Sequence, residues 1–329
     1  MRHWVGAGAT AWTLAGSLLA ASLLAGAALL PGPTGVGDML PRTAPAPAQG
    51  EHPIGLLPMA PMVDERRRAL GERLFTDPRL SGDGSRSCAS CHDLRTNGAT
   101  ANRRDLGLDG QDLPLNTATV FNAALSFRLG WEGDVRSLEA HTEALLQNPA
   151  IMGANLDVVL RRLAADPPVA SAFRSAYGRP ADKEALLDAL VSFQRGLVTP
   201  GSRFDRWMAG ETSAITPEER AGYDLFRRIG CAACHQGANI GGNLFQRHGI
   251  FHALAAPEPR ILRVPSLRNV AVTAPYFHDG GAATLGEAVR GMGLAQLNLV
   301  LDNGQVASIV AFLHTLTGEY RGAPLTAPP

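Results

Sequence analysis

Residues 88–92 read CASCH, and the pattern returns at residues 231–235 as CAACH. These two motifs contain all four cysteines of the chain. A pair of thiols two residues apart can form a redox disulfide, and two such pairs can bind one zinc ion. Neither chemistry needs a histidine directly after the second cysteine. Attachment of haem c does need it, because the thiols form thioethers with the porphyrin while the adjacent imidazole ligates the iron. The motifs therefore predict two covalently bound haem c groups, held by Cys88, Cys91 and His92 and by Cys231, Cys234 and His235.

The composition limits the classes of partner and the size of the fold. The 329 residues are enough for one large domain or two ordinary ones. With 30 basic and 30 acidic residues, the net charge of zero gives no electrostatic basis for binding nucleic acid. Aromatic residues make up only 6% of the chain, so a buried non-protein group could supply part of the core.

The first thirty residues predict export. Arg2 and His3 precede an uncharged run of Ala, Leu, Gly and Ser that extends to Leu30. This pattern is typical of a signal peptide, and the run is also long enough to cross a bilayer. Cleavage of residues 1–30 and their retention as an N-terminal anchor both stay open. Residues 31–61 are rich in Pro, Gly and Ala and predict a mobile linker. We therefore expect a periplasmic protein whose folded part begins near residue 62.

Helix-capping residues followed by apolar positions at helical spacing predict a mainly α-helical fold. No sustained alternating strand pattern is present. The last helix is expected from about Gln305 to Leu316. Six other helices are expected to begin after the N-cap residues Asp64, Ser137, Asn155, Asp182, Thr216 and Thr284.

A weak internal repeat accompanies the cysteine motifs. LGERLF, residues 70–75, precedes the first motif, and GYDLFRRIG, residues 222–230, precedes the second. Each stretch reads as a helix that ends in Leu-Phe before the cysteines. The repeat predicts two copies of one module, an N-terminal domain over 62–200 and a C-terminal domain over 201–329.

Most of the chain, over residues 64–320, resembles the bacterial diheme cytochrome c peroxidases and their relative MauG, which oxidises a partner protein. The resemblance implies two all-α cytochrome-c-like domains packed against each other, each with its own haem c. It also implies that hydrogen peroxide reacts at the N-terminal haem. Electrons would enter at the C-terminal haem from a small c-type cytochrome or cupredoxin. A homodimer is a possible assembly. The similar segments lie at residues 70–92, 116–125, 131–140, 197–210, 264–281 and 287–297.

Several further site residues are implied by this resemblance alone. Met292 matches the sixth iron ligand of the electron-transfer haem, a position that is Tyr in MauG, although a Met in a helix can equally be core packing. Trp131 matches the inter-haem tryptophan, which can relay electrons or simply pack between the domains. Asn116 and the carbonyls of Thr273 and Pro275 match an inter-domain calcium site, whose oxygen ligands suit a hard cation.

Two departures affect the N-terminal haem. Leu108 stands where many of these peroxidases have a histidine that caps the iron, so we expect this iron to be open or water-bound. Ile151 stands where the family has a glutamate that moves the peroxide proton, and isoleucine cannot do so. His141 is a candidate replacement, because an imidazole titrates near neutral pH. It could also ligate the iron or do neither.

These features leave three hypotheses for the function. The leading one is a periplasmic diheme peroxidase that reduces hydrogen peroxide to water. Leu108 favours the second hypothesis, a MauG-like oxidase that modifies a residue of a partner protein, whereas Met292 argues against it. The third is a non-enzymatic diheme electron carrier or sensor, because Ile151 replaces the catalytic glutamate.

Overall fold

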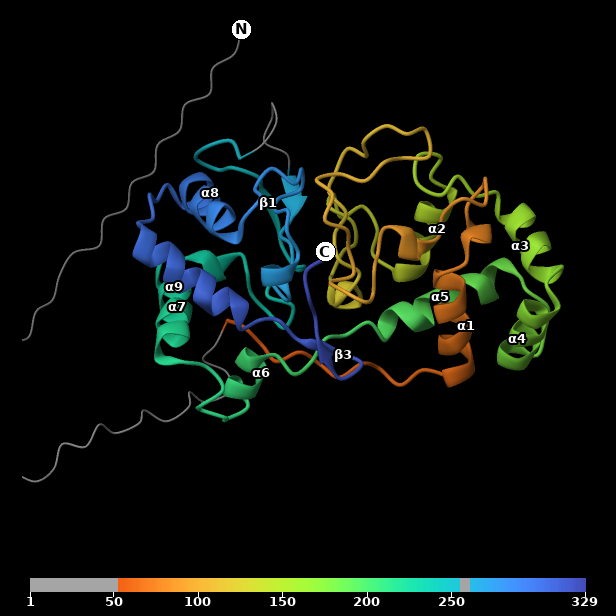
Figure 1. Cartoon of the computed structure of the whole chain (residues 1–329), viewed down its shortest axis with the longest axis horizontal. Coiled ribbons are helices and arrows are strands. Elements are labelled where there is room, and N and C mark those ends of the chain that lie inside the picture. The colour runs from red at the N-terminus through yellow and green to blue at the C-terminus, as the bar shows by residue number, and fades with distance from the viewer. Residues whose placement is uncertain (1–52, 255–260) are drawn as a thin grey trace, which may run out of the picture. The chain divides into compact units, whose positions relative to one another are not determined.

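The computed structural model describes residues 53–254 and 261–329. The leader predicted over 1–30 lies outside these residues. Helices dominate the described part, which contains only four very short strands. Figure 1 shows α1–α5 gathered on one side and α7–α9 on the other, with long loops between them. None of the helices described there is long and apolar enough to cross a membrane. The prediction of an all-α fold is confirmed.

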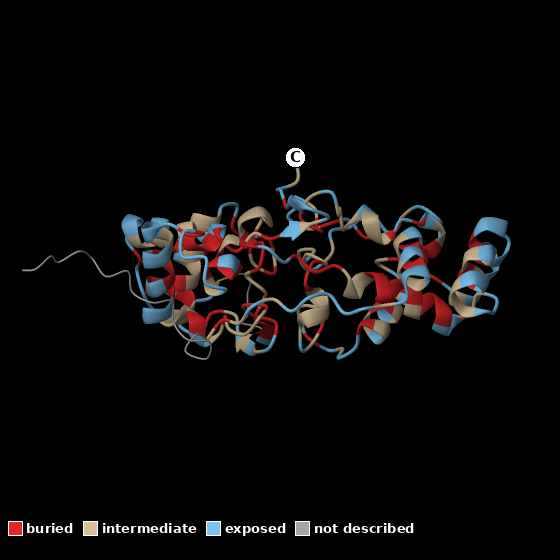
Figure 2. Ribbon diagram, turned by 90° about the horizontal axis from the view of Figure 1, so that it is seen from below, coloured by how far each residue is buried: buried red, intermediate tan, exposed pale blue. Residues whose placement is uncertain are grey.

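Each half has its own hydrophobic core, and Figure 2 shows buried residues on the inner faces of the helices and in the connecting loops. The N-terminal half contains α1 (Glu65–Phe75), α2 (Leu138–Gln147), α3 (Leu156–Ala164), α4 (Pro167–Tyr177) and α5 (Lys183–Arg195). The C-terminal half contains α6 (Arg203–Met208), α7 (Pro217–Arg228), α8 (Leu285–Leu297) and α9 (Asn303–His314). Its strands β1 (Phe245–Arg247) and β2 (Ile261–Arg263) pair antiparallel, as do β3 (Glu319–Tyr320) and β4 (Ala323–Pro324).

The capping residues predicted the helix starts correctly. Each of the six side chains accepts a hydrogen bond from the first turn of its helix, which satisfies backbone N–H groups that have no helical partner. The last helix begins at Asn303, slightly earlier than predicted, because Asp302 caps it. Two helices were not predicted, α4 and α6, although Asp166 and Ser202 cap them in the same way.

The internal repeat corresponds to a repeated helix crossing. In the N-terminal half, Gly71 of α1 lies so close to α5 that a Cβ atom there would be 1.9 Å from the carbonyl oxygen of Ala189. In the C-terminal half, a Cβ on Gly222 of α7 would be 1.9 Å from the carbonyl oxygen of Ser308 in α9. One turn further on, the phenylalanines of the Leu-Phe pairs contact the opposing helix in both halves, at 5.3 and 5.2 Å between ring centroids. Both helix pairs therefore cross in the same way.

The described chain begins inside the C-terminal half, earlier than the start predicted near residue 62. Ile54 is only 1% exposed and belongs to the core of that half. The Pro53 carbonyl oxygen accepts a hydrogen bond of 2.8 Å from the Gly237 N–H. The end of the segment predicted as a mobile linker over 31–61 is therefore held in place, because a buried isoleucine and backbone hydrogen bonds fix it.

The C-terminal tail packs against the core of the N-terminal half. Leu325 is 7% exposed and belongs to the core of the N-terminal half. Tyr320 of β3 packs on Phe121, with 4.9 Å between the ring centroids. The tail therefore joins the core of the N-terminal half, and the division into 62–200 and 201–329 stays a prediction. Each half receives a segment from the far end of the chain, and these segments tie the two halves together.

Candidate functional site

The first cysteine motif forms a short 3₁₀ turn (Cys88–Ser90) just beyond the first helix crossing. The N–H groups of Cys91 and His92 both donate to the Cys88 carbonyl oxygen, at 3.2 and 3.0 Å. The Nδ1 atom of His92 lies 3.0 Å from the carbonyl oxygen of Gly98. A backbone carbonyl at this position makes Nδ1 the donor and leaves Nε2 as the free ligand atom. Phe75 packs 6.5 Å from the imidazole between ring centroids.

The second motif repeats this geometry in the C-terminal half. The N–H groups of Cys234 and His235 donate to the Cys231 carbonyl oxygen at 3.2 and 3.0 Å. Phe226 lies 6.4 Å from the His235 ring. His235 is buried, and the backbones of Ile240 and Pro265 lie beside its imidazole. Burial lowers the pKa of His235 to about 4, which favours the neutral imidazole that a metal requires.

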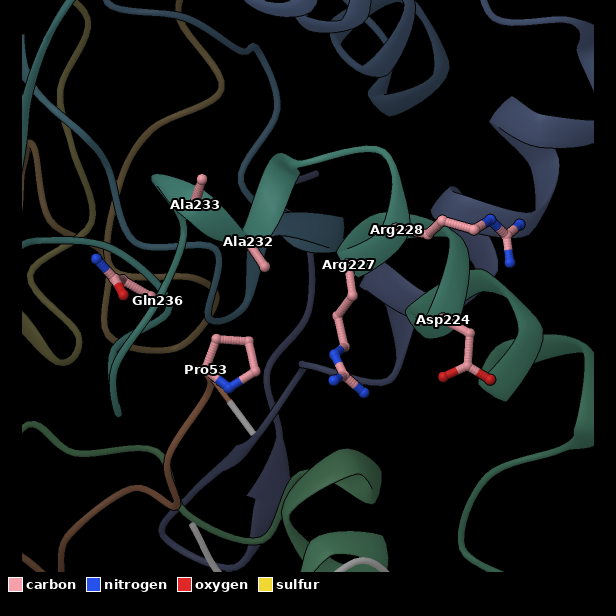
Figure 3. A pocket seen from close by; sticks show the side chains of 7 residues that line it. All are labelled: Pro53, Asp224, Arg227, Arg228, Ala232, Ala233 and Gln236. Atoms are coloured by element: carbon pink, nitrogen blue, oxygen red, sulfur yellow. The ribbon is translucent and has the colours of Figure 1, made fainter. Parts of the chain in front are cut away.

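These residues fit two haem c groups. All four cysteines are free thiols beside an imidazole whose pKa is lowered by desolvation, so it is neutral at pH 7. Among the described residues, no three His, Cys, Asp or Glu side chains converge on one point, so the four thiols do not form a single zinc site. Figure 3 shows the outer side of the second motif, where Ala232, Ala233 and Gln236 border a surface hollow beside Arg227. When haem is bound, it would supply the redox chemistry of the site.

Helix α8 places Met292 on its inward side. Ala288 and Ala295, one turn before and after it on the same face, are both buried. At the end of α8, Leu297 approaches the second cysteine motif, since a Cβ atom on Gly230 would lie 3.7 Å from its Cδ2 atom. Met292 itself is partly buried. Ligation by Met292 stays a prediction, and the direction of α8 is compatible with it.

Trp131 lies where the two halves meet. Its indole N–H donates to the Asn116 carbonyl oxygen at 2.7 Å, and its own carbonyl accepts from the Arg263 N–H at 2.8 Å. The indole is 6.4 Å from the ring of His278. Trp131 is thus held by the N-terminal half on one side and by the C-terminal half on the other. His248 packs edge-on against His278 at 4.2 Å, a contact that the sequence did not indicate.

The residues predicted to bind calcium come from both halves. The N–H group of Asn116 donates to the His278 carbonyl at 2.8 Å, which brings Asn116 beside the segment that contains Thr273 and Pro275. The side-chain amide nitrogen of Asn116 donates to the carbonyls of Asn102 and Arg103. This orientation leaves the Asn116 side-chain oxygen as the atom that could face a cation. Calcium binding stays a prediction.

Apolar residues stand at both positions where the sequence departs from the family. The Leu108 N–H donates to the Ala150 carbonyl at 2.9 Å, so this residue lies directly beside the loop that contains Ile151. Ile151 packs against the core of the N-terminal half. The two departures are therefore neighbours in space.

His141 lies close to the N-terminal cysteine motif, near enough for the charge of His92 to affect it. A Cβ atom on Gly130 would be 3.7 Å from its Cε1 atom. Burial first, and then the nearby charges of His92 and Arg263, lower the pKa of His141 to about 4. The imidazole is therefore neutral at pH 7 and can accept a proton. Glu143, one of the other acidic residues nearby, instead pairs with Lys183 at 3.0 Å.

Two covalent haem sites on two cytochrome-c-like halves define a diheme c-type cytochrome. The family model for di-haem cytochrome c peroxidase matches residues 65–213. Cytochrome c551 peroxidase of Nitrosomonas europaea is 37% identical over 268 residues, which cover 76% of this chain and 79% of that protein. The methylamine utilization protein MauG of Methylorubrum extorquens is 33% identical, covering 80% of this chain and 81% of its own length. The chain belongs to the diheme cytochrome c peroxidase family, and it is an oxidoreductase.

Solved structures agree with this assignment. A MauG-like protein associated with microbial copper homeostasis superposes with a TM-score of 0.72 at 27% identity, covering 83% of this chain and 96% of that one. The diheme peroxidase BthA from Burkholderia thailandensis superposes with a TM-score of 0.67 at 20% identity, covering 81% and 91%, which supports the fold alone. The predicted family and fold are confirmed, and membership of the family implies two haem c groups.

Proposed function

We propose that this protein is a periplasmic peroxidase that reduces hydrogen peroxide at the N-terminal haem with electrons that enter at the C-terminal haem. The balanced reaction takes one peroxide, two protons and two electrons to two waters. The observation that carries the proposal is the position of Trp131, which is hydrogen-bonded to both halves of the chain. An indole held in this way offers a fixed path between two redox centres. Export by residues 1–30 would place the protein with its donor.

His141 is the residue that we assign to proton transfer. Cleavage of the O–O bond requires a base that takes the proton from one peroxide oxygen and returns it to the leaving oxygen. Burial keeps His141 neutral, so a ring nitrogen is free to accept that proton. Leu108 and Ile151 offer no competing iron ligand or base, and their apolar side chains limit water beside the site.

Electrons would enter through the end of α8. Met292 would close the C-terminal iron to peroxide and raise its reduction potential. Just beyond it lie exposed apolar side chains, with Val300 at 89% exposed and Leu294 at 40%. Phe251, itself exposed, is fixed beside them by a hydrogen bond of 2.9 Å to the Ala295 carbonyl. Such a surface suits brief contact with a small c-type cytochrome or cupredoxin.

Calcium, if it binds through Asn116, Thr273 and Pro275, would fix the junction that also holds Trp131. Its removal by a chelator should then slow electron transfer between the haems without releasing either haem. Turnover that is unchanged after calcium is removed, as verified by metal analysis, would contradict this role.

The function is tested by peroxide-dependent oxidation of a reduced c-type cytochrome by the diheme protein. His141→Gln should lower kcat/KM for peroxide by about 10²-fold or more, the usual contribution of general acid–base catalysis. His314→Gln, at an exposed position in α9, is the matched control and should leave the rate unchanged. Trp131→Phe should slow electron transfer between the haems while the first reaction with peroxide stays fast. No donor oxidation by the parent protein would refute the proposal.

Ile151→Glu adds an independent test of the proton transfer. If His141 already moves the proton, a second base brings little gain in peroxidase rate. A gain of 10²-fold or more would show that the natural site lacks a working base and would remove His141 from this role.

A second candidate function is that of a MauG-like oxidase, which would oxidise a residue in a partner protein. Leu108 favours it, because leucine cannot cap the N-terminal iron in the resting protein. Mass spectrometry of a co-purifying protein before and after peroxide would detect the modification. Rapid turnover with a small redox donor and no change in partner mass would favour the peroxidase.

A further inference from the structure

Arg263 is a buried cation at the junction of the two halves. It ends strand β2 and is only 9% exposed. Its backbone N–H donates to the Trp131 carbonyl at 2.8 Å, and its side-chain Nε donates to the Gly130 carbonyl at 2.9 Å. These two hydrogen bonds fix the direction of the guanidinium and leave its two terminal nitrogens for another partner.

No carboxylate pairs with Arg263 among the residues that the structure describes. The comparison with Arg268 in the same segment shows what is missing. Arg268 is 1% exposed, and its guanidinium donates to the Asp205 carboxylate at 2.7 Å. Burial lowers the pKa of both arginines, but only in Arg268 does a carboxylate oppose that effect. A buried charge without a counter-ion is unfavourable, so we expect an anion to bind Arg263.

The surroundings identify where this anion comes from. His141 lies beside the Gly130 backbone to which Arg263 donates, since a Cβ atom on Gly130 would be 3.7 Å from the His141 Cε1 atom, and its neutral imidazole cannot balance a positive charge. The charges of His92 and Arg263 both lower the pKa of His141, so Arg263 and the N-terminal haem motif lie near the same imidazole. Two residues after Arg263, the backbone of Pro265 lies beside His235 of the other motif. Arg263 therefore lies in the region between the two haem-binding motifs.

We propose that Arg263 binds a propionate carboxylate of a bound haem. Haem c carries two propionates, and a guanidinium with two free terminal nitrogens can bind a carboxylate through two parallel hydrogen bonds. The inference rests on haem attachment at the two cysteine motifs. Because Arg263 belongs to the C-terminal half, a propionate of the N-terminal haem would be bound across the junction. Arg263 is thus a positioning residue for that haem and a source of positive potential next to it.

The test is the reduction potential of each haem in Arg263→Gln and Arg263→Lys, measured by spectroelectrochemistry on protein shown to carry two haems per chain. Loss of the positive charge stabilises the oxidised iron, so Arg263→Gln should lower the potential of one haem. We expect about a tenfold change in its one-electron reduction equilibrium, which corresponds to about 59 mV. Arg263→Lys keeps the charge but loses the two-pronged geometry, so its potential should lie between those of Arg263→Gln and the parent.

The control is Arg290→Gln, since Arg290 is exposed and donates only to Asn303 within the described chain. A shift at the open haem assigns the propionate to the N-terminal group, and a shift at the Met-ligated haem assigns it to the C-terminal group. Unchanged potentials in both Arg263 variants, or an equal shift in Arg290→Gln, would overturn the proposal. If Arg263→Gln fails to fold, the Arg263→Lys potentials alone decide. A shift without peroxidase activity would support this inference while refuting the proposed function.

Discussion

Replacing Gly71 with alanine should destabilise the N-terminal half by about 2 kcal/mol, because α1 touches the backbone of α5 at this glycine. The new Cβ atom would lie 1.9 Å from the Ala189 carbonyl oxygen and 2.8 Å from the Cβ atom of Phe193. Ordinary contact begins at 3.4 Å, so the two helices would have to separate by about 1.5 Å. Such a separation costs packing along the whole crossing, at the upper end of the range of about 1–3 kcal/mol for overpacking. The better helix propensity of alanine returns at most about 1 kcal/mol.

Gly222→Ala should destabilise the C-terminal half by a similar amount, because its Cβ atom would lie 1.9 Å from the Ser308 carbonyl oxygen. The matched control is Gly286→Ala in α8. There the Cβ atom would lie 3.8 Å from Val306 Cγ1, which is an ordinary contact, so this variant should keep or slightly raise the stability.

The assay is thermal unfolding of the haem-loaded protein, followed by far-UV circular dichroism and haem absorbance. A loss of about 2 kcal/mol should lower Tm by roughly 4–8 °C in a protein of this size. Gly71→Ala should perturb the spectrum of the N-terminal haem first, and Gly222→Ala the spectrum of the C-terminal haem. If both variants unfold at the temperature of Gly286→Ala, the helices do not cross as closely as the structure has them.

Three further predictions concern stability. Arg268→Met should destabilise the protein by about 3–5 kcal/mol, because it leaves the buried Asp205 carboxylate without its cation. Chemical denaturation measures the free energy of unfolding, and a loss of less than about 1 kcal/mol would contradict this role of Arg268. Partial burial raises the pKa of Glu219, but the hydrogen bonds that it accepts from Arg203 and from the capping residue of α7 lower the pKa overall. The ionised Glu219 side chain therefore stabilises the fold fully above the usual glutamate pKa, and this contribution is lost as pH falls through the lowered value. Arg203→Gln should therefore flatten the acid limb of a Tm-against-pH curve, and an unchanged limb would count against the ion pair. Tyr320→Ala should loosen the C-terminal tail and make it sensitive to limited proteolysis while both haems remain bound, whereas a tail as resistant as the parent's would show that this ring does not hold it.

The sequence predicted the local features of this fold well, because each depends on a few adjacent residues. Asp182 and Thr216 marked helix starts through their capping chemistry, and the histidines of the two motifs marked haem attachment. The places of the chain ends could not be predicted in the same way. Ile54 and Leu325 each stand in a Pro- and Gly-rich segment without helical spacing, and only the tertiary structure shows that each belongs to the core of the opposite half.

The site was predicted unevenly for the same physical reason. Trp131 and Met292 could be recognised from the family pattern of their surroundings. Arg263 could not, because an arginine that is buried without a carboxylate looks like any other arginine in a sequence. The signal that could have drawn attention to it was its place directly before the segment of family resemblance over 264–281.

The repeated module also explains where the two haem sites can differ. The helix crossings at Gly71 and Gly222 and the two cysteine turns share the same contacts, so this frame cannot make one site reactive and the other an electron carrier. The difference must come from the segments that face the other side of each haem. In the C-terminal half we expect this segment to be α8, which carries Met292, the predicted sixth ligand. In the N-terminal half we expect it to be the loop of Leu108, which is hydrogen-bonded to Ala150, together with the helix that carries His141. Substitutions in these segments should therefore change the chemistry of one haem without loss of its attachment, whereas substitutions in the shared frame should act on folding first.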